Sequence, residues 1–360
     1  MEVLTIVGAR PQFVKAAVVS RAFQKLGIDE RILHTGQHFD AAMSDVFFDE
    51  MEIPKPHFNL DINGVGHGAM TGRMLEGIEQ IMLEDKPKVV LVYGDTNSTL
   101  AGALAAQKLH IPVVHVEAGL RSYNMGMPEE VNRILTDRIS TILYTPTITA
   151  TKNLEKEGYA GFDIAIEQVG DVMEDAAQFY SQKLGEKESN LPEIPKEFVL
   201  VTAHRAENTD DPEKLKGIIN GLEAINKMTP VIFPLHPRTK GKLKQFDITP
   251  SFQCIEPVGY FDMIRLLQAC KMVLTDSGGL QKEAYFFKKP CITMRDQTEW
   301  VELLEAGVNT LVACNSEKIK AAFDGFSSGA FDFTKPLYGG GEAGDKIANS
   351  VFHHFLKTES

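Results

Sequence analysis

With 360 residues, the chain is long enough to form two domains of ordinary size. Its 43% apolar and 24% charged residues are typical of globular proteins with a large core, which excludes the disordered and fibrous classes. The formal net charge of −12 disfavours nucleic acid as a partner, because an acidic surface repels a phosphate backbone.

Cysteine usage and hydropathy predict a cytoplasmic protein. The four cysteines show no C-x-x-C spacing, which favours free thiols in a reducing compartment over disulfides or zinc. The apolar N-terminal run is too short for a signal sequence, and no run approaches the roughly 20 apolar residues that span a bilayer. We therefore expect no membrane association.

Short β-branched runs alternate with longer amphipathic runs, the pattern of βαβ units with a parallel sheet. In the first half, strands are predicted at residues 3–7, 31–34, 89–93, 113–116, 141–144 and 164–169, and helices at 12–25, 69–83 and 99–108. In the second half, strands are predicted at 198–201, 231–234, 253–255, 272–274 and 291–293, and helices at 212–226, 260–269, 279–287 and 316–323. The fold class expected is α/β, with two doubly wound parallel-sheet domains facing a central cleft.

A strand run ends near Gly170, and a charged stretch with two prolines follows at 185–196. We expect an N-terminal domain over 1–170, joined by a C-terminal helix at 345–358, and a second domain over 171–344. Because ligands of parallel sheets bind beyond the carboxyl ends of the strands, the residues that follow each strand are the candidates for function.

The first strand is followed by Gly8-Ala9-Arg10-Pro11, with Lys15 in the first turns of the next helix. A helix N-terminus beside an arginine predicts an anion cradle, with an ordinary βα turn as the alternative. The segment is neither G-x-G-x-x-G nor a P-loop, so no dinucleotide or ATP site is indicated. Asp95 follows the strand at 89–93, either as a functional acid or as a helix N-cap.

Two further acids stand at strand or helix ends. Glu117 ends the apolar strand at 113–116, where burial is costly unless the carboxylate is paired, so it is either catalytic or the ion-pair partner of Arg121. Glu129 opens a helix behind Pro128 and shares a helix face with Arg133. The alternative for Glu129 is an ordinary first-turn acid that the helix dipole stabilises.

In the second half, His204 and Arg205 follow the strand at 198–201, where such a pair can supply a proton donor and a phosphate contact. The alternative for His204 is an ordinary core or surface histidine. Ser277-Gly278-Gly279 follows the strand at 272–274 and offers bare amides at a helix start, which suits a diphosphate. A tight glycine turn is the alternative. We find no metal-ligand cluster and predict no metal or cofactor. The residues alone indicate proton transfer on a phosphorylated or nucleotide-linked substrate.

Seven motifs occur in order along the chain. They are Gly8-Ala9-Arg10-Pro11, His34-Thr35-Gly36-Gln37-His38, Gly94-Asp95-Thr96, His115-Val116-Glu117-Ala118-Gly119-Leu120-Arg121, Pro128-Glu129-Glu130-x-Asn132-Arg133, His204-Arg205-x-Glu207-Asn208 and Thr275-Asp276-Ser277-Gly278-Gly279-x-Gln281-x-Glu283. This set resembles the non-hydrolysing UDP-N-acetylglucosamine 2-epimerase family from residue 1 to residue 341. The resemblance implies a GT-B-like arrangement of two Rossmann-like domains, with UDP held mainly by the second.

The resemblance also implies a reaction: the C2 hydrogen of a UDP-2-acetamido sugar is removed as UDP leaves, and the resulting 2-acetamidoglucal is reprotonated on its other face as UDP re-adds. By their positions in the family's motifs, the acid/base groups are expected to be Asp95, Glu117 and Glu129, and His204 is expected to assist near the leaving phosphate. Substrate-binding roles fall to Arg10, Lys15, Arg133, Val258, Met263, Ser277, Gly278, Gly279 and Glu283. Of these, Glu283 is expected on the ribose, and Val258 and Met263 on the uracil.

One position departs from the common family pattern, because Trp300 stands where many members carry an arginine. This resembles the branch acting on UDP-2,3-diacetamido-2,3-dideoxy-glucuronate, a precursor for surface polysaccharide; UDP-N-acetylglucosamine is the other candidate substrate. The family resemblance further implies a homodimer. A GT-B glycosyltransferase with a UDP-sugar donor and a non-catalytic UDP-sugar sensor are the alternative functions.

Overall fold

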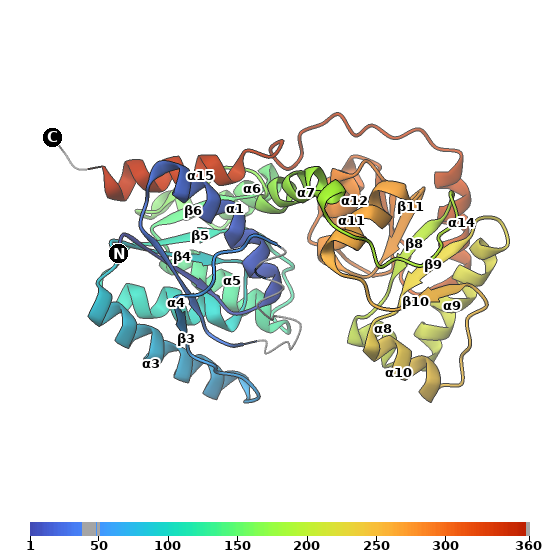
Figure 1. Ribbon diagram of the computed structural model, residues 1–360, viewed down its shortest axis with the longest axis horizontal. Coiled ribbons are helices and arrows are strands. Elements are labelled where there is room, and N and C mark those ends of the chain that lie inside the picture. Colours follow the sequence, from blue (N-terminus) through green and yellow to red (C-terminus); the bar gives the residue numbers. More distant parts are fainter. Residues whose placement is uncertain (38–47, 49–50, 358–360) are drawn as a thin grey trace. The chain divides into compact units, whose positions relative to one another are not determined.

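The computed structural model describes residues 1–37, 48 and 51–357 of the chain (Figure 1). The chain divides into two compact units, Met1–Gln178 with Pro336–Ser360, and Phe179–Lys335. The division falls within the helix α7 (Val172–Gln182). Among the described residues, no helix combines the length and the apolar composition needed to cross a bilayer.

Within its described residues, the first unit contains a seven-stranded parallel sheet in the order β3-β2-β1-β4-β5-β6-β7. The strands are β1 (Val3–Val7), β2 (Glu30–His34), β3 (Phe58–Asn59), β4 (Val89–Tyr93), β5 (Val113–Val116), β6 (Ile142–Thr145) and β7 (Ala165–Gln168). The strand order reverses between β1 and β4, which makes their carboxyl ends the switch point where doubly wound sheets bind ligands.

Burial explains why these segments form strands. β1 and β4 lie in the middle of the sheet, and every one of their residues is buried, as expected for parallel strands covered on both faces. The sheet is flanked by α1 (Arg10–Leu26), α3 (His67–Asp85), α4 (Asn97–Lys108), α5 (Pro128–Ile139), α6 (Ile148–Lys156), α7 and α15 (Ala343–Val351). The core under α3 and α4 includes Met74, Ile78, Val90 and Val92.

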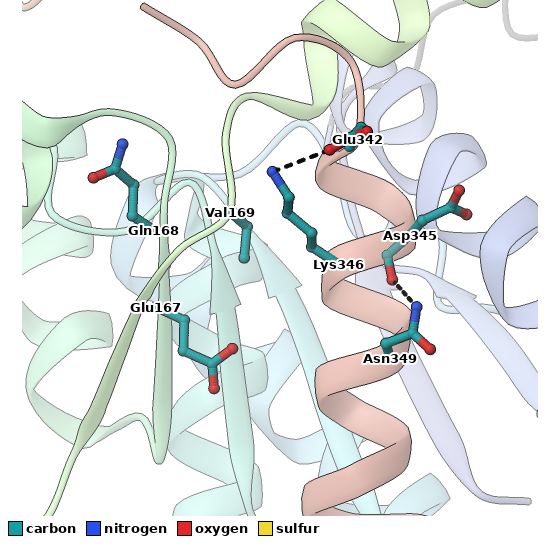
Figure 2. Close-up of a pocket in the computed structure, with 7 residues that line it drawn as sticks. All are labelled: Glu167, Gln168, Val169, Glu342, Asp345, Lys346 and Asn349. Carbon is teal, nitrogen blue, oxygen red and sulfur yellow. Dashed lines mark hydrogen bonds and ion pairs between the residues drawn. The ribbon is translucent and has the colours of Figure 1, made fainter. Parts of the chain in front are cut away.

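The C-terminal helix α15 packs against α1 (Figure 1). Asp175 of α7 fixes its start, because the carboxylate accepts the N–H groups of Ala343 and Gly344 at 3.2 and 2.9 Å. Helical structure begins at Ala343, two residues before the expected start, and the last turn, Phe352–Leu356, is π-helical. A pocket of about 460 Å³ lies between β7 and α15, at the edge of the sheet and away from the switch point. Figure 2 shows the residues that line it.

The second unit, all of whose residues are described, contains a six-stranded parallel sheet in the order β10-β9-β8-β11-β12-β13. The strands are β8 (Val199–Thr202), β9 (Val231–Pro234), β10 (Gln253–Ile255), β11 (Met272–Thr275), β12 (Cys291–Thr293) and β13 (Asn309–Leu311). The helices are α8 (Ala206–Thr209), α9 (Pro212–Asn226), α10 (Pro237–Gln245), α11 (Tyr260–Ala269), α12 (Gly278–Phe286), α13 (Val301–Glu305) and α14 (Ser316–Ser327). Its switch point lies between β8 and β11.

The predicted α/β class and the predicted strands are confirmed, the strands to within one residue. Two strands were not predicted, β3 and β13. Both are short edge strands with half-exposed residues, so neither carries the buried apolar run that marks a central strand.

Candidate active site

A cavity of about 300 Å³ lies at the switch point of the first unit, beyond the ends of β1 and β4. Its polar lining comes from the first turns of α1, the segment after β2, the turn after β4 and the starts of α3 and α5. This lining includes Gln12, Lys15, Gln37, His67, Asp95, Glu129 and Asn132. The structure thus brings together two of the acids predicted from the sequence, Asp95 and Glu129, with Lys15.

Asp95 forms an ion pair with Arg133 of α5 and is not the helix cap that the sequence left open. Thr96 caps α4 instead, because its side chain accepts the N–H of Thr99. Burial raises the pKa of Asp95, the positive charge of Arg133 opposes that rise, and the nearby charge of Glu117 adds to it. The result is a carboxyl group whose proton affinity is increased, as an acid/base group requires.

Arg133 also forms an ion pair with Glu130, a residue to which the sequence analysis assigned no role. The Glu130 carboxylate is fully buried and accepts Arg133 Nη1 at 2.5 Å. It also accepts the N–H groups of Ser122 and Tyr123. Burial acts to raise the pKa of Glu130, but these hydrogen bonds and Arg133 hold it below its usual range, so Glu130 remains charged. Glu129, the neighbouring acid, is exposed and lines the cavity.

Glu117 lies at the end of β5 and forms an ion pair with Lys15 of α1. Its backbone adopts a φ of +70°, a conformation that costs a non-glycine residue free energy and that clusters at functional sites. Gly94 lies against this pair: a Cβ there would be 3.3 Å from Glu117 Oε2 and 3.7 Å from Lys15 Nζ, at a φ of +61°. The three residues therefore form one packed group beside Asp95.

The possibility that Arg121 pairs with Glu117 is wrong. Arg121 instead donates to Asp137 at 2.7 Å and, through two nitrogens, to Glu157 at 2.8 Å. Asp137 is buried and also binds His115 Nδ1 at 2.7 Å, while His115 Nε2 reaches the carbonyl of Gly94 at the same distance. This buried network joins the turns after β4 and β5, and so supports the backbone that carries Asp95 and Glu117.

The anion cradle expected beside Arg10 stays a prediction, and the amides of Gly8 and Ala9 are already engaged within the protein. Both N–H groups donate to Gln12 Oε1, at 2.8 and 3.0 Å, and Gln12 Nε2 donates to the carbonyl of Tyr93 at 2.7 Å. The buried Gln12 therefore ties the turn after β1 to the end of β4. Any anion bound here would be met by side-chain charge rather than by those amides.

In the second unit, Asp276 follows β11 and is fully buried. Its carboxylate accepts the N–H groups of His204 and Arg205 and the side-chain N–H of Asn208, at 2.9 to 3.1 Å. The imidazole of His204 lies with Nδ1 3.5 Å from Asp276 Oδ1, and its side chain is 41% exposed. The switch point of this sheet therefore holds an outward-facing histidine backed by a carboxylate.

Beside His204 and Asp276, Ser277 caps α12 by accepting the N–H of Leu280. Gly278 is crowded by Glu299 and Trp300: a Cβ there would overlap Glu299 Oε1 and would lie 3.8 Å from Trp300 Nε1. Gly279 is exposed at the helix start. The backbone at this helix start is therefore exposed at Gly279, and the diphosphate contact there stays a prediction.

The remaining residues of this unit that were predicted to bind the substrate lie on α11, on α12 and in the segment before α11. Val258 and Met263 are half-buried against the apolar core, and Glu283 is half-buried in the second turn of α12. Trp300 is 3% exposed, and the ammonium of Lys282 stacks 4.2 Å from its ring centroid. Sequence reasoning missed Lys282, since a buried lysine in a helix has no local signal.

Sequence reasoning also gave no role to Gln12, His67 and Asp276. Gln12 follows the first motif and Asp276 lies within the last, which was the available signal, whereas His67 lies outside all seven motifs. Each of the three also has a hydrogen-bond partner that is distant in the chain. His38 of the second motif lies outside the described residues. Within the described residues, no group of three or more His, Cys, Asp or Glu is arranged to hold a metal ion.

Comparison with known proteins defines the class. The profile of the UDP-N-acetylglucosamine 2-epimerase family matches residues 21–351. The chain is 53% identical over 350 residues to UDP-2,3-diacetamido-2,3-dideoxy-D-glucuronate 2-epimerase of Pseudomonas aeruginosa, covering 97% of this chain and 98% of that protein. It is 43% identical to UDP-N-acetylglucosamine 2-epimerase of Methanocaldococcus jannaschii, covering 96% of this chain and 98% of that protein.

The solved structures agree. The crystal structure of the M. jannaschii UDP-GlcNAc 2-epimerase in complex with UDP-GlcNAc and UDP superposes with a TM-score of 0.87, at 41% identity, covering 98% of this chain and all of that chain. Acinetobacter baumannii MurG, at 13% identity and a TM-score of 0.55, shares the fold. The GT-B-like fold class predicted from the sequence is confirmed. The chain belongs to the UDP-N-acetylglucosamine 2-epimerase family.

Proposed function

We propose that the protein epimerises a UDP-2-acetamido sugar at C2 by eliminating and re-adding UDP. This proposal rests on one observation: Asp95, Glu129 and the Glu117–Lys15 ion pair lie together at one switch point, in a chain that belongs to this family. A base takes the C2 proton, the C–H electron pair forms the C1=C2 bond, and the C1–O pair leaves with UDP. Proton delivery to the opposite face and attack of UDP on C1 complete the reaction without an oxidant or a cofactor.

The first unit supplies the acid/base groups in this proposal. Two faces of one carbon must exchange protons, so more than one carboxyl group is needed, and we assign this work to Asp95, Glu117 and Glu129. The raised pKa of Asp95 supports its part. Lys15 and Arg133 are assigned to the phosphate and sugar region, where their ion pairs orient them.

We assign UDP binding mainly to the second unit. The departing diphosphate requires electrostatic stabilisation, because C2–H is not acidic by itself. Arg10 of the first unit and the exposed start of α12 are assigned to the diphosphate, and His204 to the leaving phosphate. The residues assigned to UDP through the second unit are Ser277, Gly278, Gly279, Glu283, Val258 and Met263, with Glu283 on the ribose and the last two on the uracil.

For the particular sugar, we propose UDP-2,3-diacetamido-2,3-dideoxy-glucuronate, with UDP-GlcNAc as the second candidate. The identity of 53% to the P. aeruginosa enzyme of that name supports this choice. So does the identity of the residue at position 300, a tryptophan where many family members carry an arginine; its ring is 3% exposed and stacks on the Lys282 cation.

The test is proton exchange at C2 in D₂O, run in parallel with both nucleotide sugars. We expect deuterium at C2 with one of them, and Asp95→Asn should reduce incorporation at least 100-fold. Asp29→Asn, which removes a charge at an exposed site of the same unit, should leave it unchanged. Lack of exchange with both sugars refutes the epimerase; transfer to an acceptor without exchange identifies a glycosyltransferase, and tight binding without turnover a sensor.

We also propose a cytoplasmic homodimer. The state of the four cysteines, all free, supports a reducing compartment. The homodimer rests on the family resemblance. Sedimentation velocity should give a species of twice the chain mass of 39.8 kDa, and a species of the single chain mass at micromolar concentration would contradict it.

A further inference from the structure

We propose that Asp276 is a positioning residue for His204, holding its imidazole in the tautomer with the proton on Nδ1 and with Nε2 as the nitrogen that exchanges protons. The role of Nε2 in turnover rests on the proposed function. The tautomer does not, since it follows from the contacts within the second unit. Asp276 itself touches no substrate in this proposal, and it acts only through His204.

The geometry of the carboxylate carries the inference. Asp276 is fully buried, and its Oδ1 lies 3.5 Å from His204 Nδ1. The same carboxylate accepts the backbone N–H of His204 at 3.1 and 3.0 Å, so it holds the backbone of the residue whose ring it lies beside. At 3.5 Å this contact is electrostatic rather than a hydrogen bond: a negative carboxylate attracts an N–H at Nδ1 and repels a lone pair there, which favours Nδ1 as the protonated nitrogen of the neutral ring.

The neighbouring groups leave this assignment intact. His236 faces His204 with ring centroids 5.6 Å apart and a tilt of 33°. Its Nδ1 accepts the N–H of Arg238, and burial, then the charges of His204 and Arg238, lower its pKa, so it stands neutral beside His204. Arg238 itself is paired with Asp210.

The substitution Asp276→Asn turns this geometry into a test. Oδ2 accepts both the N–H of Arg205 and the side-chain N–H of Asn208, so the amide oxygen of the variant must take the Oδ2 position. Its NH₂ group then takes the Oδ1 position and faces His204 Nδ1, and the backbone N–H of His204 keeps its acceptor at the Oδ2 position. An NH₂ group donates, so the variant ring must accept at Nδ1 and carry its proton on Nε2, the reverse of the native tautomer.

The primary measurement is the ¹⁵N spectrum of histidine-labelled protein at a pH where His204 is neutral, with its signals assigned by their loss in His204→Gln. We expect a protonated Nδ1 and a bare Nε2 in the native protein, and the reverse in Asp276→Asn. Asp211→Asn is the matched control, since Asp211 caps α9 in the same unit and asparagine caps equally well. The control should give the native spectrum.

A protonated Nε2 in the native protein overturns the proposal even if the variant does not fold. An unchanged tautomer in a folded Asp276→Asn also overturns it. In the C2 exchange assay, the variant should lose 100-fold or more in kcat with KM within about threefold, because proton transfer and not binding is impaired. A rise in KM alone would show a merely structural role. If the native protein exchanges no C2 proton, the proposed function fails while the tautomer result stands.

Discussion

Replacing Arg133 with methionine should destabilise the first unit measurably. Its guanidinium binds Asp95 and the fully buried Glu130, and its side chain is 10% exposed. Removing one partner of a buried ion pair costs about 3–5 kcal/mol, because the other charge is left uncompensated. Glu130 keeps hydrogen bonds from Ser122 and Tyr123, so we expect the low end, about 3 kcal/mol. For a unit of roughly 200 residues this corresponds to a loss of about 6–12 °C in Tm.

The assay is thermal denaturation followed by circular dichroism, as a double-mutant cycle with Glu130→Gln. The two residues contact each other, so the double variant should be more stable than the sum of the single losses predicts, by about 2 kcal/mol. Arg138→Met is the control on the same helix, because Arg138 is exposed and stacks on the face of Phe162; it should cost less than about 1 kcal/mol. Additive losses for Arg133 and Glu130 would refute the pairing as a source of stability.

Three further predictions concern the support of the site. Gly94→Ala should slow C2 exchange at least tenfold with the circular dichroism spectrum unchanged, because the added Cβ meets Glu117 at a strained φ; an unchanged rate would contradict this. Gln12→Leu should cost about 2–4 kcal/mol in thermal denaturation, since it strips two buried N–H groups of their acceptor, and a loss below 1 kcal/mol would argue against it. Burial acts to raise the pKa of Asp137, but His115 and Arg121 hold it below 3.8, so its stabilisation is present above that pH and is lost as the pH falls. Asp137→Asn should therefore flatten the acid limb of the stability curve, and an unchanged limb would disprove this.

The sheet architecture could be predicted because each central strand is marked by a continuous apolar run in the local sequence. Val89–Tyr93 is a continuous apolar run, and the structure buries all five residues. The edge strand Asn309–Leu311 lacks such a run and escaped prediction. Edge strands are defined by the partner they pair with rather than by their own composition.

The candidate residues could be located because each follows a strand, but their pairing could not. Arg121 is four residues from Glu117, and its partners are Asp137 and Glu157. Lys15, which pairs with Glu117, is 102 residues away in the chain. Local spacing does not indicate which strand ends the sheet order brings together.

The sequence by itself determined the class of fold, the family and the positions at which acids follow strands, since these depend on periodicity and on ordered motifs. The tertiary structure alone decided which charge meets which: Asp95 with Arg133, Glu117 with Lys15, and Asp276 behind His204. An ion pair forms between groups that the strand order brings within a few ångströms, whatever their separation along the chain. The proton affinity of an acid such as Asp95 therefore depends on the tertiary structure, which sets its burial and its charged neighbours.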